Sequence, residues 1–209
     1  FLICFQGFIG WYMVSSGLVD RIDVSHFRLS LHLLIAFFIL SLILWNYLKL
    51  QNINFPNQKL NSLIPIFFIF LIFCQITLGA FVSGMDAGKI YNSWPLMGSS
   101  FFPDDSKYYQ LFELSVFSDP SLTQFMHRNL AYLILVYYLF ILVKIYKNNL
   151  KDFYYSINLI GILLVIQIIF GILTLVNGAQ ILLSSMHQIS SIFLVSSAIY
   201  FLFLNNKIN

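Results

Sequence analysis

The sequence predicts an all-α integral membrane protein built as a bundle of transmembrane helices. Of its 209 residues, 59% are hydrophobic and only 9% are charged, which is more apolar surface than one soluble core can hide. Apolar runs of about 20 residues, each long enough to cross roughly 30 Å of hydrocarbon, recur along the chain. We place six helices at 1–19, 27–48, 62–84, 122–146, 154–176 and 182–204.

The charges between these runs predict how the bundle lies in the membrane. Lysines gather in the second and fourth connections and in the C-terminal tail, at Lys49, Lys59, Lys144, Lys147, Lys151 and Lys207. The remaining connections are richer in acids. By the positive-inside rule the lysine side faces the cytoplasm or the mitochondrial matrix. We therefore expect a protein of the bacterial cytoplasmic membrane or the mitochondrial inner membrane, with its long acidic connection outside. The net charge of +3 is too small to indicate a nucleic-acid partner.

The first, third and fifth runs share a glutamine followed four residues later by a glycine. These pairs are Gln6 with Gly10, Gln75 with Gly79, and Gln167 with Gly171. On a helix of 3.6 residues per turn, each pair lies on one face. We expect the glycine to let two backbones approach closely, and the glutamine amide to bond across the interface or to the edge of a ligand.

The second, fourth and sixth runs each carry one histidine at a similar depth, His32, His127 and His187. The chain is therefore a helical hairpin repeated three times, with a glutamine–glycine helix followed by a histidine helix. All three histidines are expected near the outer ends of their helices. His26, at the start of the second helix, is expected to be solvated or interfacial.

One connection, residues 84–121, is much longer than the others. Nearly forty residues without a spanning helix are more typical of a functional cap than of a slack linker. Within it we expect Asp86 to have a structural role in a turn around Gly84 and Gly88. Tyr91 and Trp94 are candidates for anchoring at the lipid headgroups, and Trp94 is also a candidate for contact with a ligand.

Neutral imidazoles facing one another inside a helical bundle are typical metal ligands. A zinc site takes four ligands, but each helix here offers one histidine and no nearby acid. Copper could use Met126 or Met186, yet each points about 100° away from the adjacent histidine. Haem iron needs only two axial ligands, which two helices can supply from opposite sides, so haem matches best.

His127 and His187 are the natural axial pair, because they belong to the last two hairpins. His32 has no equivalent partner in the sequence. The chain also opens with Phe1 inside an apolar run and without an initiator Met, so we expect it to be N-terminally incomplete. Arg128, directly after His127, is a candidate for contact with a haem propionate or with a carboxylate of the outer loop.

These motifs together resemble the haem A synthase family in its mitochondrial and proteobacterial form. The resemblance covers nearly the whole chain, in the blocks 6–18, 24–33, 75–88, 91–97, 124–132, 171–176 and 186–188.

The resemblance implies eight helices in two pseudo-symmetric four-helix halves, of which this chain resembles helices three to eight. Residues 1–61 would be the remainder of the N-terminal half, and 62–209 the C-terminal half. His127 and His187 would be the axial ligands of a haem b, and His32 would belong to the site of the substrate, haem O. The catalytic residues are expected on an N-terminal helix outside this sequence.

The implied reaction oxidises a ring methyl of haem O to a formyl group, giving haem A for cytochrome oxidase. The implied partners are haem O synthase and cytochrome oxidase assembly factors, with an electron donor that the residues do not identify; a homo-oligomer is compatible with the pattern. Two other functions stay open. One is a non-catalytic bis-histidine b-type cytochrome that relays electrons, and the other is a haem-free bundle whose histidines relay protons.

Overall fold

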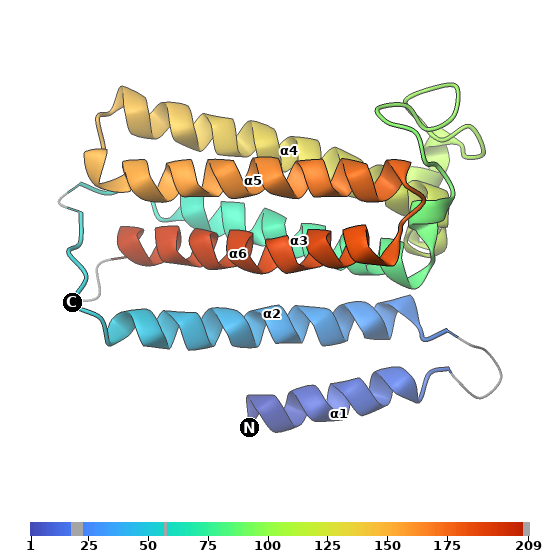
Figure 1. Cartoon of the computed structure of the whole chain (residues 1–209), viewed down its shortest axis with the longest axis horizontal. Helices are drawn as coiled ribbons and strands as arrows, with labels where there is room; N and C mark the ends of the chain where they lie inside the picture. Colours follow the sequence, from blue (N-terminus) through green and yellow to red (C-terminus); the bar gives the residue numbers. More distant parts are fainter. Residues whose placement is uncertain (18–22, 57, 207–209) are drawn as a thin grey trace.

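A computed structural model describes residues 1–17, 23–56 and 58–206 of the chain. The described part is a bundle of long helices with one elaborate loop at one end (Figure 1). The helices are α1 (Leu2–Val14), α2 (His26–Lys49), α3 (Leu63–Gly84), α4 (Pro120–Lys147), α5 (Tyr154–Val176) and α6 (Ile181–Asn205). Short 3-10 helices are η1 (Ala87–Lys89), η2 (Tyr108–Phe112), η3 (Leu114–Ser118) and η4 (Lys151–Phe153).

The predicted helices from 27 onward are confirmed, with every end within two residues of its predicted place. These five helices are long and apolar enough to cross a membrane. The first differs, because α1 has 13 residues and ends at Val14. The hydroxyls of Ser15 and Ser16 donate to the carbonyls of Tyr12 and Met13 at 2.9 and 2.6 Å, which closes the last turn. The last two positions of the predicted run, 18 and 19, lie outside the described residues.

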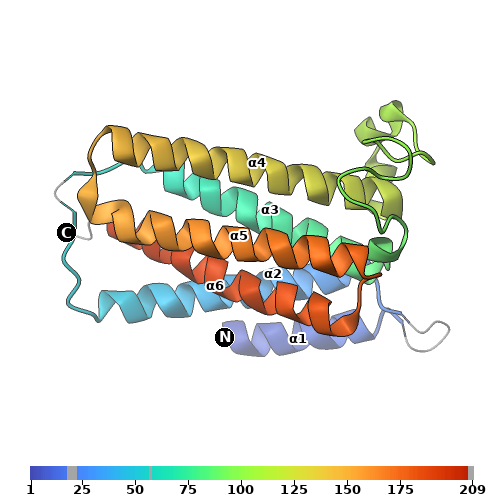
Figure 2. The same ribbon diagram turned by 45° about the horizontal axis from the view of Figure 1, so that its top comes forward.

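The helices pack as hairpins. α3 lies against α4 and α5 against α6, while α3 also contacts α6 (Figures 1 and 2). α2 packs on both α3 and α6, and α1 packs mainly on α2. α4 also contacts α5, beside which it lies in Figure 1, but less closely than it contacts α3. The prediction that the chain divides at residue 61 into two halves stays a prediction.

Local signals set the helix ends. α4 begins where Asp119 accepts a hydrogen bond from the amide of Leu122 at 2.9 Å, with Pro120 in the first position. Two residues beyond the ends of α4 and α5 the backbone takes a positive φ, 54° at Asn149 and 68° at Gly178. In each case the next amide reaches back to a carbonyl of the last turn, as in a Schellman motif. Such tight ends allow the antiparallel hairpins.

One buried clamp holds the end of the bundle opposite the long loop. The side chain of Asn205 accepts from the amide of Leu60 at 2.8 Å and donates to the carbonyl of the same residue at 3.1 Å. Asn205 is 1% exposed, so both hydrogen bonds are shielded from water. The connection between α2 and α3 is thereby fixed to the end of α6. We call the other end of the bundle, where the long loop lies, the loop end.

Candidate functional site

The three histidines lie at matching depth from the loop end. His32 is the seventh residue of α2, His127 the eighth of α4 and His187 the seventh of α6, which places each about two turns inside its helix. All three side chains are half-buried. The helices are tied at this depth by the repeated glutamine and glycine.

The first hairpin shows the arrangement. The amide nitrogen of Gln6 donates to the backbone carbonyl of His32 at 3.0 Å and lies 3.2 Å from Nδ1 of the ring. The ring packs against Gly10, where an added Cβ would lie 3.0 Å from Cε1 of the histidine. Glutamine and glycine therefore hold two sides of one imidazole.

The second hairpin repeats it. The amide nitrogen of Gln75 donates to the backbone carbonyl of His127 at 3.0 Å and lies 3.3 Å from Nε2. A Cβ at Gly79 would lie 3.2 Å from Cε1 of His127. The Nδ1 atom of His127 is buried without a hydrogen-bond partner.

The third hairpin has the same glutamine and glycine beside its histidine, and it adds the hydroxyl of a serine. The amide nitrogen of Gln167 lies 3.4 Å from Nε2 of His187, and Ser190 donates to the side-chain oxygen of Gln167. A Cβ at Gly171 would lie 3.1 Å from Cε1 of the ring. The Nδ1 atom of His187 lies 3.1 Å from the backbone carbonyl of Gln167. With an N–H on Nδ1 that donates to this carbonyl, Nε2 is the acceptor of the ring, and in this structure it faces the amide of Gln167.

This geometry corrects one expectation from the sequence. The spacing of glutamine and glycine, repeated three times within the chain, predicted close contact between helix backbones. At Gly10, Gly79 and Gly171 the atoms that an added Cβ would meet are instead ring atoms of the paired histidine. The glycine is needed because an imidazole, rather than a neighbouring backbone, fills the space above it.

The pairing of His127 with His187 as ligands of one haem stays a prediction. Their hairpins are joined through the contact of α3 with α6. His32 lies between α1 and α2 with its own glutamine and glycine. Within the described ranges, no three His, Cys, Asp or Glu side chains cluster to hold a metal ion. The imidazoles that lie against a glycine of the preceding helix are those of His32, His127 and His187.

Arg128 is bound to the loop. Its Nη1 donates to the carbonyls of Ser93 and Leu96 at 2.9 and 3.3 Å, and its Nη2 to that of Tyr91 at 2.9 Å. The sequence analysis named a carboxylate of the outer loop as one candidate partner of Arg128. In the structure, backbone carbonyls of the loop accept its hydrogen bonds instead. The Nε–H of Arg128 is buried without a partner. Contact of this remaining donor with a propionate stays a prediction.

The long loop is folded around a second polar centre, Asp105. The hydroxyls of Tyr91 and Ser121 donate to its carboxylate at 2.9 and 2.7 Å. Desolvation acts to raise the pKa of Asp105, but hydrogen bonds from Ser121, Tyr91 and Ser106 outweigh it and hold the pKa below its ordinary value. The pKa of Tyr91 is raised, by desolvation first and by Asp105 second. The carboxylate therefore ties the middle of the loop to the start of α4.

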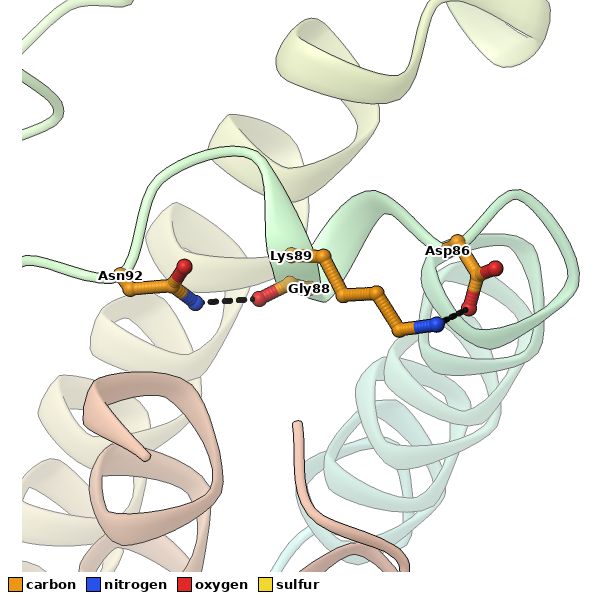
Figure 3. A network of polar contacts seen from close by, with 4 residues as sticks. All are labelled: Asp86, Gly88, Lys89 and Asn92. Carbon is orange, nitrogen blue, oxygen red and sulfur yellow. Dashed lines mark hydrogen bonds and ion pairs between the residues drawn. The ribbon is translucent and has the colours of Figure 1, made fainter. Parts of the chain in front are cut away.

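The structure gives contacts to the loop residues whose roles the sequence left open. Asp86 adopts a left-handed conformation, φ 53°, and its carboxylate pairs with Lys89 at 2.9 Å (Figure 3). This matches the expected turn. The indole N–H of Trp94 donates to the hydroxyl of Tyr132 at 3.0 Å. His26, the first residue of α2, makes a T-shaped contact with the ring of Phe81 near the loop end of α3.

Comparison with known proteins agrees with this architecture. A sequence model of the COX15-CtaA family, described as cytochrome oxidase assembly protein, matches residues 1–199. The chain belongs to the COX15-CtaA family. It is 49% identical over 209 residues to a protein of Pelagibacter ubique named "Heme A synthase", covering 100% of this chain and 61% of that protein.

Relatives in other bacteria carry the same name. Identity is 39% to the protein of Rickettsia prowazekii, over 98% of this chain and 62% of the relative. It is 37% to that of Flavobacterium johnsoniae, over 94% and 59%. The chain thus spans about three fifths of the length of these relatives. Membership of the COX15-CtaA family confirms the resemblance read from the sequence blocks.

Sequence reasoning missed several polar residues of the site. Asn92 donates both to the carbonyl of Gly88 and, at 2.8 Å, to that of Leu175 at the end of α5 (Figure 3 shows the former). Gln124 donates to the carbonyl of Tyr91 at 3.1 Å. Asn92 and Gln124 lie within blocks that carried the family resemblance, which was the available signal. Leu175 is far from Asn92 in the chain, and Tyr91 is far from Gln124, so spacing could not identify these contacts.

Proposed function

We propose that this chain is part of a haem A synthase that oxidises a ring methyl of haem O to a formyl group. The observation that carries the proposal is that His127 and His187 lie at the same depth, each held by a glutamine and a glycine of the preceding helix. Membership of the COX15-CtaA family and the name of the relatives support the substrate. Because the chain spans about three fifths of those relatives, the activity is proposed for the whole protein.

The residues present fit a bound haem b. His127 and His187 offer two imidazole ligands from opposite hairpins, and bis-imidazole ligation suits electron transfer better than binding of oxygen. The buried Nδ1 of His127 and Nε of Arg128 have no partner within the protein. Unpartnered buried groups are uncommon, so they support a bound ligand with polar groups at this end of the bundle. The Nε–H of Arg128 is the donor that we assign to a propionate.

The protein residues have positioning roles in this proposal. Haem b, when bound, supplies a one-electron couple, and the protein sets its orientation and surroundings. Gln75 and Gln167 hold the two histidines that would bind the haem, and Gly79 and Gly171 give the rings room. His32, held in the same way by Gln6, is assigned to the substrate haem O.

A simple electron-relay cytochrome is the second candidate, and His32 argues against it. A cytochrome with one bis-histidine haem needs no third histidine with its own glutamine and glycine. In this chain His32 has both, at the same depth as the other two histidines. A third histidine held in this way agrees with a second haem-binding half, which would hold the substrate.

The test is the reduced-minus-oxidised optical spectrum of the full-length protein, followed by extraction and chromatography of its haems. Haem b together with haem O or haem A supports the synthase. Haem b alone favours the electron-relay cytochrome. Absence of any haem favours the haem-free bundle whose histidines relay protons. The membrane orientation, with the lysine-rich end in the cytoplasm or matrix, and the partners named above also stay proposals.

A further inference from the structure

We propose that residues 91–96, called the cap below, cover the haem b site, and that Arg128 and Asn92 are positioning residues that hold the cap in place. The inference rests on the proposed function, because the cap matters only if haem b binds to His127 and His187. It assigns to Arg128 a role beyond any contact with a propionate.

The first attachment of the cap is to α4. Arg128 donates to the carbonyls of Tyr91, Ser93 and Leu96, which gather most of the cap around one guanidinium. Two further α4 side chains, four residues before and four after Arg128, join it. The amide of Gln124 donates to the carbonyl of Tyr91 at 3.1 Å, and the hydroxyl of Tyr132 accepts from the indole of Trp94 at 3.0 Å. Residues spaced by four lie along one helix face, so the cap follows α4 beside His127.

The second attachment is to α5. Asn92 donates to the carbonyl of Leu175 at 2.8 Å, four residues beyond Gly171, against which the ring of His187 packs. Next to the cap, Gly88 lies against the turn between α5 and α6, where its added Cβ would be 3.3 Å from that of Ala179. The loop therefore passes from the helix of one proposed ligand to the hairpin of the other. Figure 3 shows its approach, from Asp86 through Gly88 and Lys89 to Asn92.

The chemistry of the guanidinium suits this task. Arginine presents five N–H donors in a fixed fork, and three carbonyls separated along the loop can be satisfied at once. A lysine ammonium is a compact charge and cannot span the same three acceptors. Hydrogen bonds from a charged donor are stronger than neutral ones, so loss of the fork should loosen the cap.

The experiment measures release of haem b from the full-length protein to excess apomyoglobin, with the variants Arg128→Lys and Asn92→Ala. Both should keep a bis-histidine spectrum and lose haem about tenfold faster, the factor that corresponds to about 1.4 kcal/mol. The control is Arg28→Lys. Arg28 also lies near the loop end and donates to a backbone carbonyl, that of Tyr12 at 2.8 Å, but it contacts α1 instead of the cap. Its release rate should equal that of the unmodified protein.

A second measurement, on the haem-free protein, separates the cap from the haem. Amide hydrogen exchange in residues 91–96 should be faster in Arg128→Lys and Asn92→Ala and unchanged in Arg28→Lys. Unchanged exchange and unchanged haem release in both variants would overturn the inference while leaving the proposed function intact. Failure of the unmodified protein to bind haem b would overturn the proposed function, and the cap's role with it. If Arg128→Lys does not fold, Asn92→Ala, which alters only a loop side chain, decides.

Discussion

Replacement of Gly171 by alanine tests the contact between glycine and histidine. The new Cβ would lie 3.1 Å from Cε1 of His187. Non-bonded carbon atoms in van der Waals contact are about 3.5–4.0 Å apart, so the ring must move away by about 0.4–0.9 Å. Overpacking of this kind costs about 1–3 kcal/mol. Alanine also favours the helix over glycine by about 0.5–1 kcal/mol. The net effect on the free energy of unfolding is a loss of about 0–2.5 kcal/mol.

A matched control removes the helix-propensity contribution. Gly7 also lies inside a helix, α1, but an added Cβ there would meet nothing within 4 Å. Gly7→Ala should therefore be stabilising by about 0.5–1 kcal/mol. The two variants should then differ by the overpacking alone, about 1–3 kcal/mol. Gly171→Leu should extend the effect, because the larger side chain displaces the ring further.

The assay is equilibrium unfolding of the haem-free protein in detergent, together with the haem b content of the loaded protein. Gly171→Ala should be less stable than Gly7→Ala and should bind less haem b, since the ring of His187 is displaced. The reasoning is refuted if the two alanine variants gain the same stability and retain haem equally.

Three further predictions test other parts of the structure. His127→Ala or His187→Ala should abolish or severely weaken retention of b-type haem, and a normal bis-histidine spectrum in either variant would contradict the assignment. Asn205→Leu leaves both backbone groups of Leu60 buried and unpaired, at about 1–3 kcal/mol each, so thermal unfolding in detergent should show a lower midpoint; an unchanged midpoint would argue against the clamp. The pKa of Asp105 lies below its ordinary value of 3.8, so its carboxylate stabilises the loop at neutral pH, and this contribution is lost as the pH falls below 3.8 through the depressed pKa. Relative to a denatured substrate at the same pH, pepsin cleavage of the loop should accelerate over that range, and the acceleration should be smaller in Asp105→Asn.

The helices could be predicted because the bilayer imposes one length and one composition on every spanning segment. The exception, α1, ended early for a local reason, since serine hydroxyls close its last turn at Val14. The loop was harder to predict. Its order comes from single hydrogen bonds, such as those of Asp105, and these leave no periodic pattern in the sequence.

The sequence by itself determined that three histidines lie at one depth, each paired with a glutamine and a glycine of the preceding helix. Helical periodicity alone places those residues on facing sides of a hairpin. Only the tertiary structure decided that Arg128 donates to three carbonyls of the loop, and that an imidazole lies over each of the three glycines. The physical reason is that such contacts depend on how whole hairpins pack against one another. Residues far apart in the chain, such as Asn92 and Leu175, become neighbours only through that packing.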